Sequence, residues 1–274
     1  MAEVQYMDHI RGLGNVYKVY APLHDQLSSF KAEGSTHPHL ISVRDTAFAR
    51  LQGKLSDWTR TCHAPVYKKG KKPILIRNSP LMNGRGKFTL AKRAVEAHAT
   101  GRWLTQKGAY DKYSQQAKED ANKNPEKRRA IVLDEREDFQ IDANSPVAQF
   151  LFQDTIDKYF ENVRNRNPIQ VYLINPDTVD NIDESIVNYL WFDSVDNGSG
   201  LGARYRDLTN GVRAFGVFGN VPKARAPKNQ PQPEAQVKPY NLEDLENAKI
   251  ELEFLREVMN PEKIGKIETL IQKL

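Results

Sequence analysis

The chain has 274 residues, a hydrophobic fraction of 39%, a single cysteine and a formal net charge of +5 at pH 7. This length can bury a core in one large domain or two small ones. One cysteine, Cys62, excludes a disulfide framework and a cysteine-rich zinc module. No stretch reaches the roughly 18 apolar residues of a membrane helix, and residues 1–12 lack the apolar run of a signal peptide. We therefore expect a soluble, cytoplasmic protein with no membrane partner.

The net charge is the sum of two opposed blocks. Residues 61–130 carry 17 Lys or Arg and 5 Asp or Glu, whereas residues 131–200 carry 4 and 14. Such an asymmetry informs on partners and self-association rather than on the fold.

The first predicted elements are a strand and a helix. Alternating Val and Tyr predict a strand over 16–20. Ser42 is an N-cap residue type with Asp45 three positions later, and apolar residues at helical spacing extend this predicted helix to Thr59.

The basic block contains a loop and a helix start. A short strand over 73–77 precedes the loop 83–87, and Thr89 is the expected cap of a helix over 90–99 that stops at Gly101. The loop brings Arg85 and Lys87 beside a helix N-terminus, which favours anions. Its glycine spacing is too short for a phosphate-binding P-loop, and an ordinary turn before a capped helix is the alternative interpretation.

Later elements follow from the same rules of periodicity and capping. In chain order, we predict a polar surface helix and charged loop over 106–129, a strand over 130–133, a helix from Ser145 and Pro146 to Val163, a strand over 169–174, a helix over 178–190 whose end at 189–192 also fits a strand, and a strand over 212–218.

These elements predict an α+β body over residues 1–220, with a mixed sheet, flanking helices, the basic segment 61–130 and the acidic segment 131–200. A proline-rich linker over 221–240 separates the body from an amphipathic helical hairpin over 241–274. Two short helices cannot bury a core alone. We therefore expect the hairpin to dock on its own body, on another copy in a homo-oligomer, or on a partner protein.

The leading functional hypothesis is binding of DNA or RNA largely without sequence specificity, as part of a ribonucleoprotein, phage or plasmid particle. Lys and Arg along a stripe bind a phosphate backbone by displacing counterions. The aromatic residues Tyr67, Phe88 and Trp103 interleave with these cations and suit base stacking. The predicted contact residues are Lys68, Lys69, Lys71, Lys72, Arg77, Arg85, Lys87, Lys92, Arg93 and Arg102.

Two alternatives come from other classes of protein. A structural assembly protein would pair its basic and acidic blocks between subunits. A Mg²⁺-dependent nuclease would use carboxylates that follow strands, such as Asp134 and Asp177. We weigh catalysis as the lesser possibility and expect no cofactor and no resident metal, and the adjacent Cys62 and His63 are not by themselves a nucleophile and base.

Overall fold

The computed structural model describes residues 3–10, 12–32, 40–82, 88–162, 168–194, 200–204 and 212–218, with the backbone alone for 31–32 and 212–218. The chain divides into two units, Met1–Pro222 and Lys223–Leu274. The predicted linker over 221–240 and the hairpin over 241–274 lie outside the described residues.

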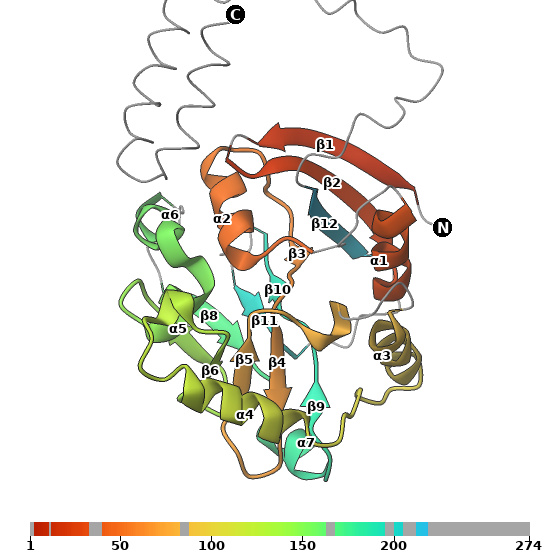
Figure 1. Cartoon of the computed structure of the whole chain (residues 1–274), viewed down its shortest axis with the longest axis vertical. Helices are drawn as coiled ribbons and strands as arrows, with labels where there is room; N and C mark the ends of the chain where they lie inside the picture. Colours follow the sequence, from red (N-terminus) through yellow and green to blue (C-terminus); the bar gives the residue numbers. More distant parts are fainter. Residues whose placement is uncertain are drawn as a thin grey trace, which may run out of the picture. The chain divides into compact units, whose positions relative to one another are not determined.

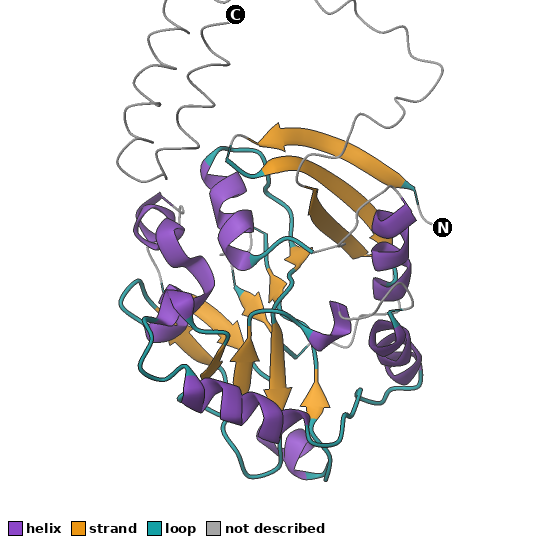
Figure 2. Ribbon diagram, in the orientation of Figure 1, coloured by secondary structure: helices purple, strands orange, loops and turns teal. Residues whose placement is uncertain are grey.

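Helices and strands both contribute to the first unit, which confirms the predicted α+β class (Figures 1 and 2). Within the described residues the helices are α1 (Leu23–Ala32), α2 (Val43–Leu51), α3 (Thr89–Ala99), α4 (Ala109–Glu119), α5 (Pro146–Phe152), α6 (Ile156–Asn162) and α7 (Pro176–Asp180), with short 3₁₀ turns η1 (Pro80–Met82), η2 (Pro125–Lys127) and η3 (Gln153–Thr155).

The strands form two sheets. The larger sheet has the order β1 (Val4–Ile10), β2 (Gly14–Ala21), β12 (Val212–Phe218), β3 (Thr59–Arg60), β10 (Trp191–Phe192), β11 (Leu201–Gly202), β8 (Ile169–Tyr172) and β7 (Phe139–Ile141). It is mixed, because β12 runs parallel to β3 and β11 runs parallel to β8. The smaller sheet is antiparallel and has the order β6 (Ala130–Val132), β5 (Ile74–Ile76), β4 (Ala64–Tyr67) and β9 (Ile186–Val187).

Strand β12 joins the two ends of the unit. It pairs with β2 along its whole length, from Val212 opposite Ala21 to Phe218 opposite Asn15. Its other edge meets β3 at Ala214 and Arg60. The β1–β2 hairpin therefore enters the larger sheet only through a strand from the far end of the unit (Figure 1).

A buried arginine reinforces this junction. Arg60 is fully buried, and its Nη1 donates to the Ala21 carbonyl at 3.3 Å and to Gln26 Oε1 at 2.9 Å. The guanidinium also lies 5.5 and 5.2 Å from the ring centroids of Tyr189 and Trp191. Because a buried cation is stable only with polar partners around it, Arg60 fixes β2 and α1 against β3 and β10.

Two large apolar clusters occupy the interior. One includes Leu27 and Phe30 of α1, Ala91 and Ala94 of α3, and the inward side chains of β4 and β5. The other gathers the aromatic side chains of α5, α6 and β10, in which Phe152 packs against Tyr159 and Phe192 at ring distances of 5.1 and 5.6 Å. The first cluster supports one wall of the site described below, because it holds the inner face of α3.

Local sequence signals explain several element boundaries. The Ser42 hydroxyl accepts a hydrogen bond from Asp45 N at 3.0 Å, which confirms the predicted cap of α2. Helix α3 begins where predicted, but Phe88 occupies the cap position in a left-handed conformation and Thr89 makes no cap. The predicted helix from Ser145 to Val163 is interrupted at Gln153, whose φ of 51° is unfavourable for a side chain with a Cβ.

Two helix predictions were too long. Helix α2 ends at Leu51, and the chain then returns as strand β3 instead of continuing to Thr59. The predicted helix over 178–190 is only α7, after which the chain forms β9 and β10. In each case an apolar residue of the predicted stripe, Leu55 or Ile186, is buried outside a helix, so tertiary pairing overrides the local periodicity.

The polar stretch over 106–129 is tied to the body at its end. The Asp120 side chain is fully buried, and it accepts hydrogen bonds from Arg129 Nε at 2.9 Å, Arg129 N at 2.8 Å and Lys123 Nζ at 2.7 Å. The guanidinium of Arg129 is the largest cause that holds the pKa of Asp120 well below its ordinary value. This carboxylate therefore closes the loop that follows α4.

We expect Asp120→Asn to lower the free energy of unfolding by about 1–2 kcal/mol at neutral pH, because charge-assisted bonds to half-exposed cations are lost. A lowered folded-state pKa means that this stabilisation is present above the ordinary carboxyl pKa of about 4 and is lost as the pH falls below it. Urea unfolding at several pH values should show the difference from the parent protein shrinking in acid. Glu119→Gln, which removes an exposed partner of Arg129, is the control and should cost less; equal losses would contradict this assignment.

The single thiol is enclosed by the core. Cys62 lies in the first apolar cluster, and its Sγ is 3.8 Å from His63 Nδ1. Burial, followed by the charge of Asp45, raises the pKa of Cys62 to about 12, and burial lowers the pKa of His63 to about 3. The neutral imidazole is a poor base for so weak an acid, so the pair is not an activated nucleophile.

We expect Cys62 to resist maleimide labelling at pH 8 in the folded protein, because the thiolate is the reactive form and burial suppresses it. Labelling should become fast and stoichiometric in concentrated guanidinium chloride, measured by mass spectrometry. Fast labelling of the native protein at a rate typical of an exposed thiol would show that this part of the core opens.

Candidate functional site

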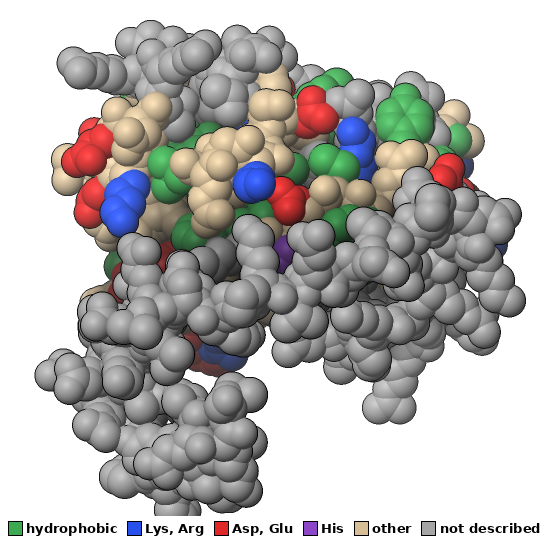
Figure 3. Space-filling model, turned by 90° about the horizontal axis from the view of Figure 1, so that it is seen from above, with side chains coloured by type: hydrophobic (Ala, Val, Ile, Leu, Met, Phe, Trp, Pro, Cys, Tyr) green, Lys and Arg blue, Asp and Glu red, His purple; other side chains and the backbone are tan. Residues whose placement is uncertain are grey.

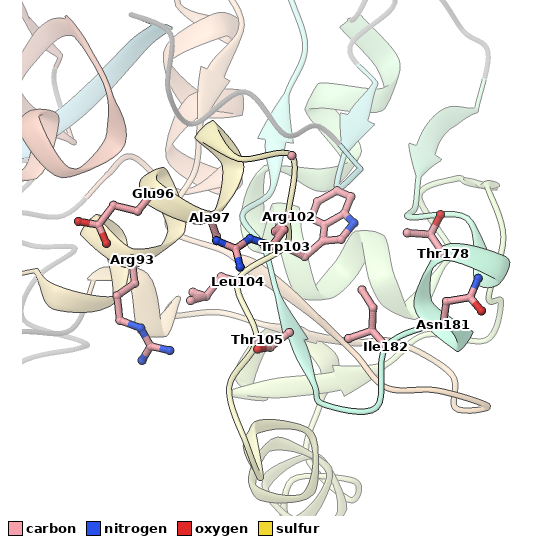
Figure 4. Close-up of a pocket in the computed structure, with 11 residues that line it drawn as sticks. Arg93, Glu96, Ala97, Arg102, Trp103, Leu104, Thr105, Thr178, Asn181 and Ile182 are labelled. Atoms are coloured by element: carbon pink, nitrogen blue, oxygen red, sulfur yellow. The ribbon is translucent and has the colours of Figure 1, made fainter.

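The main candidate site is a pocket of about 720 Å³ between α3 and α7 (Figure 4). Helix α3 supplies one wall and ends at Ala99 with Thr100 as its C-cap, after which Gly101 turns the chain with a φ of 69°. A left-handed φ suits glycine at this turn. The next residues form the floor, and Thr105 bridges to Ile186 of β9, so the smaller sheet holds the floor in place.

The opposite wall begins with α7. Asn175 caps this helix by accepting a hydrogen bond from Asp177 N at 2.8 Å, and Pro176 occupies its first turn. Thr178, Asn181 and Ile182 then line the pocket. The Asn181 amide donates to the Asp177 carbonyl at 2.9 Å, which restricts its rotamer.

The floor of the pocket is apolar and well packed. Trp103 is 8% exposed and Leu104 is 2% exposed, and half-buried Ile182 joins them from the α7 side (Figure 4). The Trp103 indole meets the ring of His98 edge to face, with centroids 5.5 Å apart. A rigid apolar floor of this kind excludes water from part of a bound ligand.

The α3 side of the pocket is cationic. Arg93 and Arg102 both line it, and both are exposed. Arg102 Nε donates to Thr100 Oγ1 at 3.0 Å, which orients this guanidinium. Among the described residues neither arginine forms an ion pair, whereas the lining carboxylate Glu96 lies 4.0 Å from Lys92. Two arginines therefore face solvent at a pocket with one partly neutralised acid.

A smaller pocket of about 400 Å³ lies beside the start of α7 and includes Asp138, Asp177 and Arg204. Asp138 is already occupied, because it accepts hydrogen bonds from Leu173 N at 2.7 Å and from Arg204 at 3.1 Å. Asp138 therefore holds Leu173 and Arg204 in place.

Eight of the ten cations predicted to contact nucleic acid are described, and they lie in several different places. Arg85 and Lys87 lie outside the described residues. Of the others, Lys68, Lys69 and Lys92 pair with carboxylates of this chain, Arg77 turns inward, Lys71 and Lys72 lie exposed at the β4–β5 turn, and Arg93 and Arg102 line the pocket.

Two of the four lysines at the β4–β5 turn pair with carboxylates of the same chain. Lys68 Nζ contacts both oxygens of Asp111, at 2.9 and 3.1 Å, and Lys69 lies 3.8 Å from Asp183. The backbone N of Gly70 donates to Asp180 Oδ1 at 2.8 Å. The basic and acidic blocks of the sequence therefore meet inside one molecule at this turn.

Arg77 is used for packing. Its guanidinium donates to the Phe150 carbonyl at 2.9 Å and lies 4.9 Å from the centroid of the Phe150 ring. On the face of the molecule seen in Figure 3, the blue and red side chains of described residues are interspersed among hydrophobic ones. On that face the described cations form no continuous stripe.

The proposed nuclease carboxylates do not converge. Asp134 is exposed after β6, and Asp177 lies in the first turn of α7. In the part of the chain that the structure describes, no three His, Cys, Asp or Glu side chains gather as a metal site. The same part contains no helix with the length and apolarity needed to cross a membrane.

The sequence analysis noted residues on only one side of the pocket. Arg93, Arg102 and Trp103 were noted within the basic segment, although for another ligand. Thr178, Asn181 and Ile182 were missed, because they lie in a stretch predicted as a long amphipathic helix. The predicted strand over 169–174 ends before Asn175 and Pro176, and this pair favours the start of a helix. It is the one local signal in the sequence for this wall of the pocket.

No protein-family model and no curated protein sequence matches the chain. The structure is similar to a solved structure that concerns the accommodation of massive sequence variation in Nanoarchaeota by the C-type lectin fold. The TM-score is 0.50 and the sequence identity 14%, and the match covers 80% of this chain and 98% of that chain. This similarity bears on the fold alone, and it places the chain near the C-type lectin fold.

The predicted nucleic-acid-binding function was wrong. The structural similarity is to a C-type lectin fold, and the described cations are divided among internal ion pairs, core packing, an isolated turn and a pocket wall. The two alternatives within that prediction gain no support from this similarity, which bears on the fold.

Proposed function

We propose that this protein is a ligand-recognition module that binds a small ligand, or the end of a larger one, in the pocket between α3 and α7. The observation that carries the proposal is the pocket itself. Its volume of about 720 Å³ falls in the range of roughly 300–1,000 Å³ of ligand sites, and it combines an apolar floor with a few polar groups at the rim.

The pocket is built for binding more than for turnover. Its described lining contains one carboxylate and no histidine, cysteine, lysine or serine. Acid–base or nucleophilic catalysis needs a second titratable group within hydrogen-bond reach of the first. Glu96 instead faces Lys92 at 4.0 Å, and the remaining polar groups are suited to hydrogen bonding with a ligand.

The fold supports the same proposal. The C-type lectin fold of the Nanoarchaeota neighbour accommodates massive sequence variation. A frame that tolerates such variation keeps its sheets while the side chains around a site change. Here the sheets hold the floor through Thr105 and Ile186, while the arginines and Asn181 project from helix and turn positions where substitution leaves the core intact.

The test is a screen of small polar and aromatic compounds, read by the indole N–H resonances of the three tryptophans. Trp103 lines the pocket, whereas Trp58 and Trp191 stack on each other elsewhere at 5.3 Å. We expect ligands to shift the Trp103 resonance selectively. Asn181→Tyr, which fills the rim from an exposed position, should weaken binding at least about tenfold, equivalent to roughly 1.4 kcal/mol.

Asn144→Tyr is the matched control, because it makes the same change at another exposed asparagine outside the pocket. It should leave affinity unchanged. A screen in which no compound moves Trp103 at millimolar concentration, or in which both tyrosine variants weaken binding equally, would overturn the proposal.

A further inference from the structure

We infer that the ligand of this pocket carries an oxyanion, a carboxylate or a phosphate, attached to an apolar body. The inference rests on the proposed recognition function and adds the chemical class of the ligand. It follows from the arrangement of Arg93 and Arg102 against Trp103, Leu104 and Ile182 around one cavity (Figure 4).

The first step concerns charge. The lining contains two guanidinium groups and one carboxylate. Glu96 is shared with Lys92, which lies 4.0 Å away. Neither arginine has an ion-pair partner among the described residues, whereas Lys68, Arg44 and Arg129 on the same molecule are each paired at 2.8–3.0 Å. The wall therefore presents positive charge that its described neighbours do not neutralise.

The second step concerns geometry. A guanidinium offers parallel N–H groups that match the two oxygens of a carboxylate or phosphate. The hydrogen bond to Thr100 Oγ1 uses Nε, and no described residue accepts a hydrogen bond from the terminal N–H groups of Arg102. Because this bond limits the freedom of the side chain, less entropy is lost when an anion binds.

The third step concerns the rest of the ligand. Burial holds Trp103 and Leu104 in place, and the parts of these side chains that line the pocket, together with half-buried Ile182, offer an apolar contact surface. A small inorganic anion would leave this apolar surface in contact with water. An anion joined to a flat or aliphatic body would cover it while its charged end meets the arginines. Thr178 and Asn181 on the opposite wall add hydrogen bonds that would select among such bodies.

The test uses three probes of one shape: 2-naphthoate, 2-naphthyl phosphate and 2-naphthamide. Affinity is measured through the Trp103 indole resonance. We expect the two anions to bind at least fivefold more tightly than the neutral amide at low salt, and this preference to shrink as ionic strength rises, because the arginines are exposed. The ratio between naphthoate and naphthyl phosphate identifies which oxyanion the site prefers.

Two variants locate the effect. The double variant Arg93→Gln and Arg102→Gln should abolish the preference for anions. Lys71→Gln with Lys72→Gln removes the same charge from an exposed turn outside the pocket and should leave the preference intact. Glu96→Gln should act in the opposite direction and strengthen anion binding two- to threefold, which a damaged fold would not do.

The outcomes separate this inference from the proposed function. If naphthamide binds as tightly as the anions, or if the Arg93 and Arg102 double variant keeps the preference, the inference is wrong while recognition in the pocket stands. If none of the probes moves Trp103 but neutral compounds from the screen do, the inference also fails alone. If no compound of either kind moves Trp103, both proposals fall.

Discussion

The pairing of β12 between β2 and β3 is the interaction on which the rest of this structure depends. It places residues from the start and the end of the first unit in one sheet, and Arg60 sits at the junction with its guanidinium bonded to Ala21 and Gln26. Because α1 follows directly from β2, this closure also positions α1 against α3. The α3 wall of the pocket therefore depends on strand pairing between residues far apart in the sequence. The residues that line this wall nevertheless all come from α3 and the turn after it.

The distribution of charge along the sequence differs from the distribution of charge on the folded molecule. In the linear sequence, the seventeen Lys and Arg residues over 61–130 predict a surface that binds a polyanion. In the folded unit, Asp111, Asp180 and Asp183 gather around the β4–β5 turn, and two of the four lysines there pair with carboxylates of the same chain. Folding leaves a smaller and more specific cationic feature, the pair of arginines at the edge of an apolar pocket.

The floor and the rim of the pocket come from different parts of the fold. The buried floor is anchored to the sheet by the Thr105–Ile186 bridge and by the hydrogen bond from Val187 N to the Leu104 carbonyl at 3.1 Å. The polar and charged groups project from helix ends and turns. A site with this division keeps its shape when the rim changes, because the rim contributes little to the core.

The sequence by itself determined the α+β class, the strands at 74–76, 130–132, 169–172 and 212–218, and the start of α2 at Ser42. These depend on alternation and capping, which are read from neighbouring residues. Only the tertiary structure decided that 186–187 and 191–192 form strands, the second of which the sequence left open between helix and strand, that Arg77 packs inward, and that Arg93 and Arg102 meet the segment 178–182 across a pocket. The physical reason is that burial and ion pairing depend on contacts between residues far apart in the chain, and a pattern of residue types does not specify which of its cations will find a partner there.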